Sequence, residues 1–249
     1  MGSPMRSRRA IVTGAGSGIG KAVALRLLRE GVDVLAVDID ASRLDDLARA
    51  DCRIKSVDLA DPAGRAKLAE AADGADYLVN SHGIIMVKSI FDITPEDWRQ
   101  VQAVNAESVF FLCQAIGPKL KPGGAIVNLS SSSSKLASTV EVAAYAASKT
   151  TILSITRSFA YALASRPVRV NAICPGIIDT PMQDSVLASV SRLRRTEIAT
   201  LEEARTRTVP LGRAASADEC AGAIWFLLSD EAAYMTGQAV NFTGGLVTW

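Results

Sequence analysis

A tyrosine and a lysine stand four residues apart in the segment Tyr145-Ala-Ala-Ser-Lys149. On a helix this spacing places the two side chains one above the other. A phenol with a pKa of about 10 is a poor base at neutral pH, but a nearby ammonium favours the phenolate. Lowering that pKa by about three units takes roughly 4 kcal/mol, which a partly desolvated charge pair can supply. Tyr145 is thus a candidate acid/base for an alcohol proton, but such a pair often occurs by chance, so the assignment depends on the other motifs of the chain.

A glycine cluster, Thr13-Gly-Ala-Gly-Ser-Gly-Ile-Gly20, separates an apolar run from a helical pattern. Glycines let a backbone turn approach a pyrophosphate, and the following helix offers free N–H groups and the positive end of its dipole. A P-loop would need glycine at position 15 and Ser or Thr at position 22, where Ala15 and Ala22 stand. The context favours a dinucleotide turn. Its expected contacts are Gly14, Ser17, Gly18, Ile19 and Gly20.

Two acidic positions follow the next apolar runs. Asp38 lies 18 residues after Gly20, where a carboxylate accepts hydrogen bonds from ribose hydroxyls and repels a 2′-phosphate. No basic residue stands at position 17 or 39, so NAD is the expected cofactor rather than NADP. Asp58-Leu59 ends the third run, where an adenine edge would lie. An Asx turn or helix cap explains Asp58 equally well.

Apolar runs alternate with helical patterns along the chain. Strands are expected at 9–13, 32–37, 52–57, 76–80, 124–129, 168–173 and 239–242. Helices are expected from the glycine turn to Gly31 and at 41–50, 61–72, 95–104, 108–120, 142–165 and 216–228. Apolar strands alternating with helices indicate an α/β fold. We expect one domain over residues 5–249: a doubly wound, Rossmann-like seven-stranded parallel sheet with helices on both faces.

The order and spacing of these motifs resemble the short-chain dehydrogenase/reductase family over residues 11–245. Asn105 resembles the helix asparagine that anchors a proton-relay water. Asn80 and Gly83 resemble the end of the fourth strand beside the cofactor. Pro175, Gly176, Ile178 and Thr180 resemble the segment that closes over the nicotinamide.

The resemblance implies that Tyr145 takes the alcohol proton while hydride passes to the nicotinamide. Lys149 would hold the ribose hydroxyls and lower the pKa of Tyr145, and a serine would orient the substrate oxygen. Counting back from Tyr145 gives Ser132, whereas counting along the strand from Asn128 gives Ser131. A loop insertion costs less than a strand slip, so Ser131 is slightly preferred.

A second departure is His82, where the family has alanine. It either contacts the cofactor ribose or solvent, or serves local packing, and packing is the preferred interpretation. Because it is the only histidine, a serine triad or a multi-histidine metal site would have to be built around it alone. No metal site is expected.

Composition narrows the possible partners and compartment. A net charge of +1 and 5% aromatic residues give no reason to expect nucleic acid, and no apolar run is long enough to span a membrane. Four widely spaced cysteines without a CxxC pair fit free thiols in a reducing, cytoplasmic environment. Residues 1–4 resemble a cloning remnant ahead of Met5.

Together these features predict an NAD-dependent oxidoreductase that interconverts a secondary alcohol or polyol and its ketone. A polar, helix-prone segment at about 179–213 is expected to form a substrate lid. Its arginines near 192–195 either form a solvated helix face or steer an anionic substrate. A homotetramer is expected from the family resemblance. The alternatives are a non-catalytic NAD(H)-binding sensor or interaction protein, and a reductase of activated C=C bonds.

Overall fold

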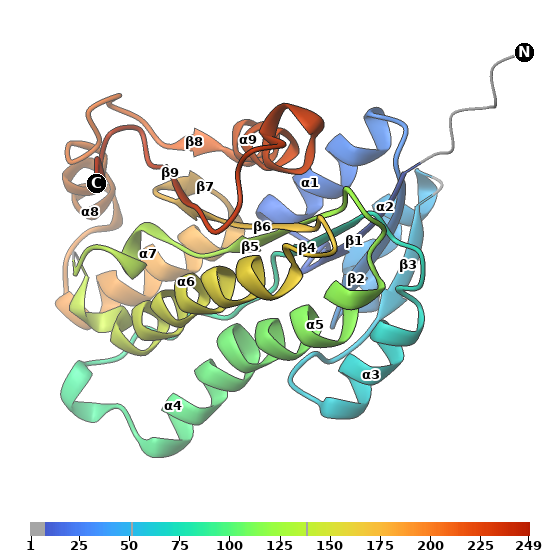
Figure 1. Cartoon of the computed structure of the whole chain (residues 1–249). Coiled ribbons are helices and arrows are strands. Elements are labelled where there is room, and N and C mark those ends of the chain that lie inside the picture. Colours follow the sequence, from blue (N-terminus) through green and yellow to red (C-terminus); the bar gives the residue numbers. More distant parts are fainter. Residues whose placement is uncertain (1–7, 51, 138) are drawn as a thin grey trace, which may run out of the picture.

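The computed structural model describes residues 8–50, 52–137 and 139–249, so the expected remnant at 1–4 lies outside the described residues. Seven parallel strands form one sheet in the order β3-β2-β1-β4-β5-β6-β9 (Figure 1). The strands are β1 (Arg9–Thr13), β2 (Asp33–Asp38), β3 (Arg53–Ser56), β4 (Tyr77–Asn80), β5 (Ala125–Leu129), β6 (Arg169–Pro175) and β9 (Ala239–Phe242). The predicted doubly wound fold is confirmed.

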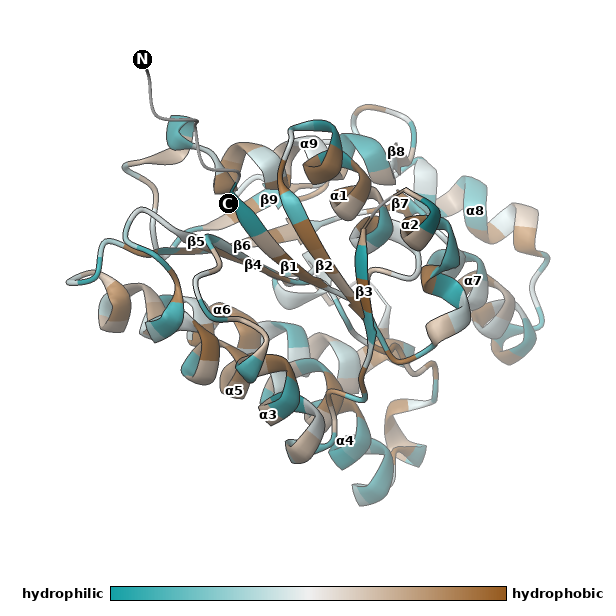
Figure 2. Ribbon diagram, turned by 90° about the vertical axis from the view of Figure 1, so that its right-hand side faces the viewer, coloured by the Kyte–Doolittle hydropathy of each residue, from teal (hydrophilic) through white to brown (hydrophobic). Residues whose placement is uncertain are grey.

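Helices cover both faces of this sheet (Figure 2). One face carries α1 (Gly18–Arg29), α2 (Asp45–Arg49) and α9 (Ala217–Leu228), and the other carries α3 (Pro62–Glu70), α4 (Pro95–Gln102), α5 (Ser108–Ile116) and α6 (Ala143–Leu163). Successive residues of a strand face opposite sides of the sheet. In β2, Val34 packs in the same core cluster as Leu27 of α1, whereas Leu35 packs in the cluster that contains Leu112 of α5. Burial on both faces explains why the strands are continuous apolar runs.

The chain reverses its winding direction between β1 and β4. Thr13 at the carboxyl end of β1 pairs in register with Val37 of β2 on one side and with Asn80 of β4 on the other. In an open parallel sheet such a reversal leaves a crevice outside the strand ends, because the loops on either side run in opposite directions. The glycine turn leaves β1 at this point.

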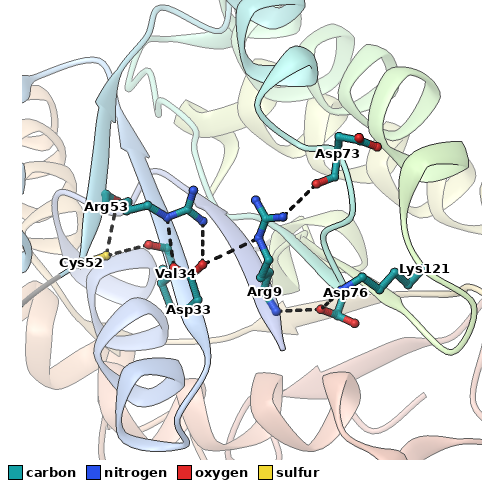
Figure 3. Close-up of polar contacts among 8 residues, drawn as sticks. All are labelled: Arg9, Asp33, Val34, Cys52, Arg53, Asp73, Asp76 and Lys121. Atoms are coloured by element: carbon teal, nitrogen blue, oxygen red, sulfur yellow. Dashed lines mark hydrogen bonds and ion pairs between the residues drawn. The ribbon is translucent and has the colours of Figure 1, made fainter. Parts of the chain in front are cut away.

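Ion pairs gather at the opposite, amino ends of the strands (Figure 3). Asp33 of β2 accepts two hydrogen bonds of 3.1 Å from Arg53 of β3 and lies 3.7 Å from Arg9 of β1. Asp76, just ahead of β4, accepts a 2.7 Å bond from the Arg9 backbone N–H and pairs with Lys121 at 3.3 Å. Exposed pairs contribute little each, but across strands they favour one register.

One feature departs from the expected elements, and another was expected only in outline. The helical region around 95–120 is interrupted by a π-helical turn, Ala103–Glu107, between α4 and α5. The expected lid segment folds as α7 (Pro181–Arg194) and α8 (Ile198–Thr206). A small parallel pair, β7 (Ile178–Asp179) with β8 (Ala215–Ser216), brackets these helices and holds both ends of the segment to the domain.

Candidate active site

A cavity of about 330 Å³ opens at the carboxyl ends of the strands, where the winding reverses. Most residues singled out in the sequence line it: Gly14, Ser17, Gly18, Ile19, Gly20, Asp38, Asp58, Leu59, Gly83, Ser131, Tyr145, Lys149, Pro175, Gly176, Ile178 and Thr180. Asn80, Asn105 and Ser132 do not line it. The fold therefore gathers residues from the whole length of the chain around one space.

The glycine turn has the geometry of a cradle. Gly14 has a φ of +65°, and a Cβ added there would lie 2.6 Å from the Cα of His82. A Cβ on Gly20 would lie 2.1 Å from the Gly14 carbonyl oxygen. Ser17 caps α1 without a side-chain hydrogen bond, so its side chain leaves the N–H groups of the first turn unpaired. Open N–H groups at a helix start suit a pyrophosphate, so the turn fits a dinucleotide.

The carboxylate of Asp38 is fixed at the edge of this cradle. One of its oxygens accepts a 2.9 Å hydrogen bond from the Gly16 backbone N–H, and the other accepts one of 3.1 Å from the Asp40 N–H. The sequence reading missed Arg43, which also lines the cavity. Its guanidinium lies 3.2 Å from the Asp40 carboxylate. The cavity edge thus holds the oriented carboxylate of Asp38 and the guanidinium of Arg43, which is paired with the carboxylate of Asp40.

Asp58 forms an Asx turn, as one of the two interpretations expected, and it is also exposed to the cavity. Its side chain accepts a 2.8 Å hydrogen bond from the Ala60 N–H, which is an Asx turn, and the residue also lines the cavity. The cap of α3 is a different residue, Asp61, whose carboxylate accepts from the Ala63 N–H at 3.0 Å.

Tyr145 and Lys149 lie on one face of α6 and are almost entirely buried. Burial raises the pKa of Tyr145, and a hydrogen bond with Ser131 opposes that rise. Burial also lowers the pKa of Lys149 to about 8. The Lys149 ammonium lies 5.6 Å from the centre of the Tyr145 ring and donates to the Leu129 carbonyl at 2.8 Å. Burial and the Ser131 contact are the causes acting on the Tyr145 pKa, and the Lys149 charge is not among them, so the lowering expected from Lys149 does not occur in the protein without cofactor.

The two candidate serines occupy different places. Ser131 lines the cavity and bonds the buried phenol of Tyr145, whereas Ser132 begins a short 3₁₀ turn and does not line the cavity. Of the two candidates, Ser131 is therefore the serine on the cavity wall.

Asn105 lies in the π-helical turn behind Lys149. Its side-chain oxygen accepts from the Ile84 N–H at 2.8 Å, and its amide donates to the Ile84 carbonyl at 2.8 Å and to the Ser148 hydroxyl at 3.0 Å. Asn80 bonds the side chain of Asn128 at 2.8 Å inside the sheet. Both asparagines fix the framework around the cavity rather than its surface.

The arginines at 192–195, in the segment expected to form a lid, do not line the cavity. Arg194 of α7 makes a two-pronged pair with Glu141, with both N–O distances 2.7 Å, and so ties the lid to the segment ahead of α6. Arg192 contacts Ser189 at 3.3 Å, and Arg195 ends α7 in the left-handed conformation. The segment expected to form a lid instead contributes Pro181, Met182 and Gln183 to the cavity, and the sequence had singled out none of these three residues.

Other features of the described residues bear on the remaining expectations. Cys52, Cys113, Cys174 and Cys220 are all free and buried. Across residues 8–50, 52–137 and 139–249, no group of three or more His, Cys, Asp or Glu could hold a metal ion. No helix in these same ranges has the length and apolar character to cross a membrane.

Comparison with known proteins places this geometry in a class. A family model described as enoyl-(acyl carrier protein) reductase matches residues 14–247. The chain is 35% identical to the 3-oxoacyl-[acyl-carrier-protein] reductase of Thermotoga maritima, over 95% of this chain and 96% of the relative. It is 34% identical to the galactitol 2-dehydrogenase (L-tagatose-forming) of Cereibacter sphaeroides, over 96% and 95%.

Among solved structures, the fold is similar to that of an actinorhodin polyketide ketoreductase solved with NADPH. The TM-score is 0.89 at 32% identity, with 98% of each chain covered. The protein is an oxidoreductase of the class that binds a nicotinamide cofactor in a doubly wound sheet. It belongs to the short-chain dehydrogenase/reductase family.

Proposed function

We propose that this oxidoreductase interconverts a secondary alcohol or polyol and its ketone with NAD as cofactor and Tyr145 as acid/base. The observation that carries the proposal is the meeting of Ser131, Tyr145 and Lys149 on the wall of the cavity that also holds the glycine turn. The polyol class is supported by the galactitol 2-dehydrogenase relative. When bound, the nicotinamide would supply the two-electron redox chemistry.

The chain's own residues would manage the proton. With its pKa raised by burial, the Tyr145 phenol keeps its proton at neutral pH and can donate it to a developing alkoxide. The Ser131 hydroxyl, bonded to the same phenol, orients the substrate oxygen beside it. Lys149, with a pKa of about 8, is mostly charged at pH 7 and supplies the positive charge that favours the phenolate in the reverse direction.

The fixed carboxylate of Asp38 supports NAD rather than NADP. Two backbone N–H groups hold it at the cavity edge, where it would accept from ribose hydroxyls and repel a phosphate. Arg43 is the nearby cation that could favour a phosphate, but Asp40 already engages it. Asp38→Ala should weaken NADH binding far more than NADPH binding in fluorescence titrations. Equal losses for the two cofactors would refute the ribose role.

Tyr145→Phe is the test of the acid/base assignment. The variant should bind NADH as tightly as the wild type but lose turnover in a screen of polyols, hydroxy acids and aryl carbinols. A wild-type protein that binds cofactor without turnover would instead favour the sensor alternative. In the same screen Ser131→Ala should lower kcat by about 100-fold and Ser132→Ala by less than about twofold. Equal rates for these two variants would contradict the choice of serine.

A reductase of activated C=C bonds is the second candidate, because the matching family model carries an enoyl reductase description. The serine hydrogen-bonded to the tyrosine favours carbonyl chemistry, since it places a donor where an alcohol or carbonyl oxygen would sit. Product analysis with an enone separates the two, because carbonyl reduction gives an allylic alcohol and C=C reduction gives a saturated ketone.

We also propose a homotetramer in the cytoplasm. Large aromatic side chains, Trp98 of α4, Phe110 of α5 and Tyr161 of α6, are solvent-exposed in the single chain, which suits burial between subunits. The free, buried cysteines suit a reducing compartment. Light scattering should give four times the chain mass of 26.2 kDa. A monomeric mass would refute the assembly.

A further inference from the structure

The imidazole of His82 bridges two elements that flank the cavity. Its Nδ1 lies 2.7 Å from the Thr13 hydroxyl at the end of β1, and its Nε2 lies 2.6 Å from the Ser108 hydroxyl at the start of α5. Both ring nitrogens therefore have protein partners, as the packing interpretation expects, and His82 also lines the cavity, as a contact with the cofactor would require. The two residues that the ring contacts, Thr13 and Ser108, belong to the framework around the proposed site.

The direction of the hydrogen bond between His82 and Ser108 follows from the backbone carbonyl of Val104. The Ser108 hydroxyl lies 2.5 Å from the Val104 carbonyl oxygen, which can only accept, so Ser108 donates there. His82 must then donate from Nε2 to Ser108, and Nδ1 of the neutral ring is left as an acceptor. The Thr13 hydroxyl has one proton and two acceptors in reach, Nδ1 at 2.7 Å and the Val79 carbonyl at 3.2 Å, and the shorter contact assigns that proton to Nδ1. The ring is neutral, since burial first and the charge of Lys149 second lower the pKa of His82 to about 3.

This hydrogen-bond chain ends in the π-helical turn that carries Asn105. Val104 and Asn105 are adjacent within that turn, and Ser108 follows it directly. Asn105 in turn clamps the backbone of Ile84 through both its carbonyl and its N–H, each at 2.8 Å. Residues 82–84 are thus fixed to the turn at both ends, by a side chain at His82 and by the backbone at Ile84.

Gly83 lies between these two anchors and against the catalytic lysine. A Cβ added to Gly83 would lie 3.2 Å from the Asn105 side-chain oxygen and 3.4 Å from the Lys149 nitrogen. The strand-end segment 82–84 therefore forms the wall that excludes water from one side of Lys149. Loosening that wall would move the lysine and admit solvent to it.

We propose that His82 is a positioning residue: through Ser108 it holds the π-helical turn, and through that turn it fixes Asn105 and the wall beside Lys149. The inference rests on the proposed function, in which Lys149 serves the reaction at Tyr145. His82 itself touches neither substrate nor reacting atoms in this role. The hydrogen bond to Ser108 holds the π-helical turn in place, and the hydrogen bond to Thr13 orients the ring.

Two substitutions test the hydrogen bonds of the two ring nitrogens separately. His82→Gln places an amide donor near the position of Nε2 and keeps the bond to Ser108. His82→Asn places an acceptor near the position of Nδ1 and keeps the bond to Thr13 alone. His82→Asn should lower kcat by about tenfold while NADH binding stays within about twofold, and His82→Gln should retain kcat within about threefold. Ser108→Ala should match His82→Asn, and combining the two should add nothing.

A readout independent of turnover is the titration of Lys149, followed by NMR in protein carrying ¹³Cε-labelled lysine and assigned with Lys149→Met. The titratable groups near its ammonium are His82, Tyr145 and Cys174. Admitting water to the lysine should raise its pKa from about 8 toward the ordinary value in His82→Asn, and leave it unchanged in His82→Gln.

The inference is overturned if the glutamine and asparagine variants lose kcat equally. It is also overturned if both change only the thermal midpoint while the Lys149 titration and kcat stay as in the wild type. Failure of the proposed function looks different: the wild type would turn over none of the screened compounds, yet the lysine titration would still respond to His82→Asn.

Discussion

Replacing Lys149 by methionine should make the ligand-free protein more stable at neutral pH. The lysine is 4% exposed, and its pKa falls from 10.5 to about 8 on folding. Keeping the ammonium buried at pH 7 therefore costs about 3 kcal/mol relative to the neutral amine. Methionine has a similar length and no charge, so it avoids this cost while filling the space.

The net gain is smaller than this cost. Lys149→Met also removes the 2.8 Å hydrogen bond to the Leu129 carbonyl, worth about 1–2 kcal/mol. We expect a net stabilisation of about 1–2 kcal/mol at pH 7, which corresponds to a rise in thermal midpoint of about 2–8 °C for a domain of this size. Turnover should be lost, so stability and activity would change in opposite directions.

The pH dependence gives the decisive comparison. Between pH 8 and 10.5 the unfolded chain binds the lysine proton more tightly than the folded one, so this group makes wild-type stability rise with pH. The stability of Lys149→Met relative to the wild type, measured by urea unfolding, should therefore fall by about 2 kcal/mol or more between pH 7 and pH 10, so that the advantage disappears or reverses. A variant less stable than wild type at pH 7, or an advantage equal at both pH values, would refute the reasoning.

Three further outcomes are expected. Glu141→Gln removes the two-pronged contact with Arg194, so the lid should loosen and KM should rise about three- to tenfold with little change in kcat; steady-state kinetics showing a fall in kcat alone would contradict this. Gly14→Ala should abolish NADH binding by fluorescence, since its Cβ would meet the backbone, whereas Gly123→Ala, also at positive φ but in open space, should bind normally. In the wild type, His82 should lower the free energy of unfolding as the pH falls from 6.5 to about 4.5, because the unfolded chain binds a proton there that the folded ring, with a pKa of about 3, does not. His82→Gln should make this loss of stability smaller when it is measured by urea unfolding. An unchanged pH dependence would contradict a neutral ring.

The sheet could be predicted because parallel strands buried on both faces are uninterrupted apolar runs between helical patterns. All seven expected strands form, and their expected bounds differ from the observed ones by a residue or two at most ends. The glycine turn could also be predicted from the sequence, because close backbone contacts such as that between Gly20 and the Gly14 carbonyl leave no room for a side chain.

What the sequence could not give depends on contacts between distant segments. The π-helical turn at Ala103–Glu107 has no distinctive composition, and its partners, His82 and Ile84, lie about twenty residues earlier. The pKa of Tyr145 was expected to fall, because spacing reveals the nearby Lys149 but not how completely the fold removes water from the phenol. Arg43 was missed because its place at the cavity edge depends on how the segment after β2 turns back.

The edge strand β3 leads directly into one wall of the cavity. Its four residues are mostly exposed, and it pairs with β2 alone, yet the chain leaving it supplies Asp58 and Leu59 to the cavity. A bound adenosine would consequently fasten a strand that few other contacts secure. Amide hydrogens of Arg53–Ser56 should exchange quickly in the free protein and slow sharply once cofactor is added, before any substrate is present.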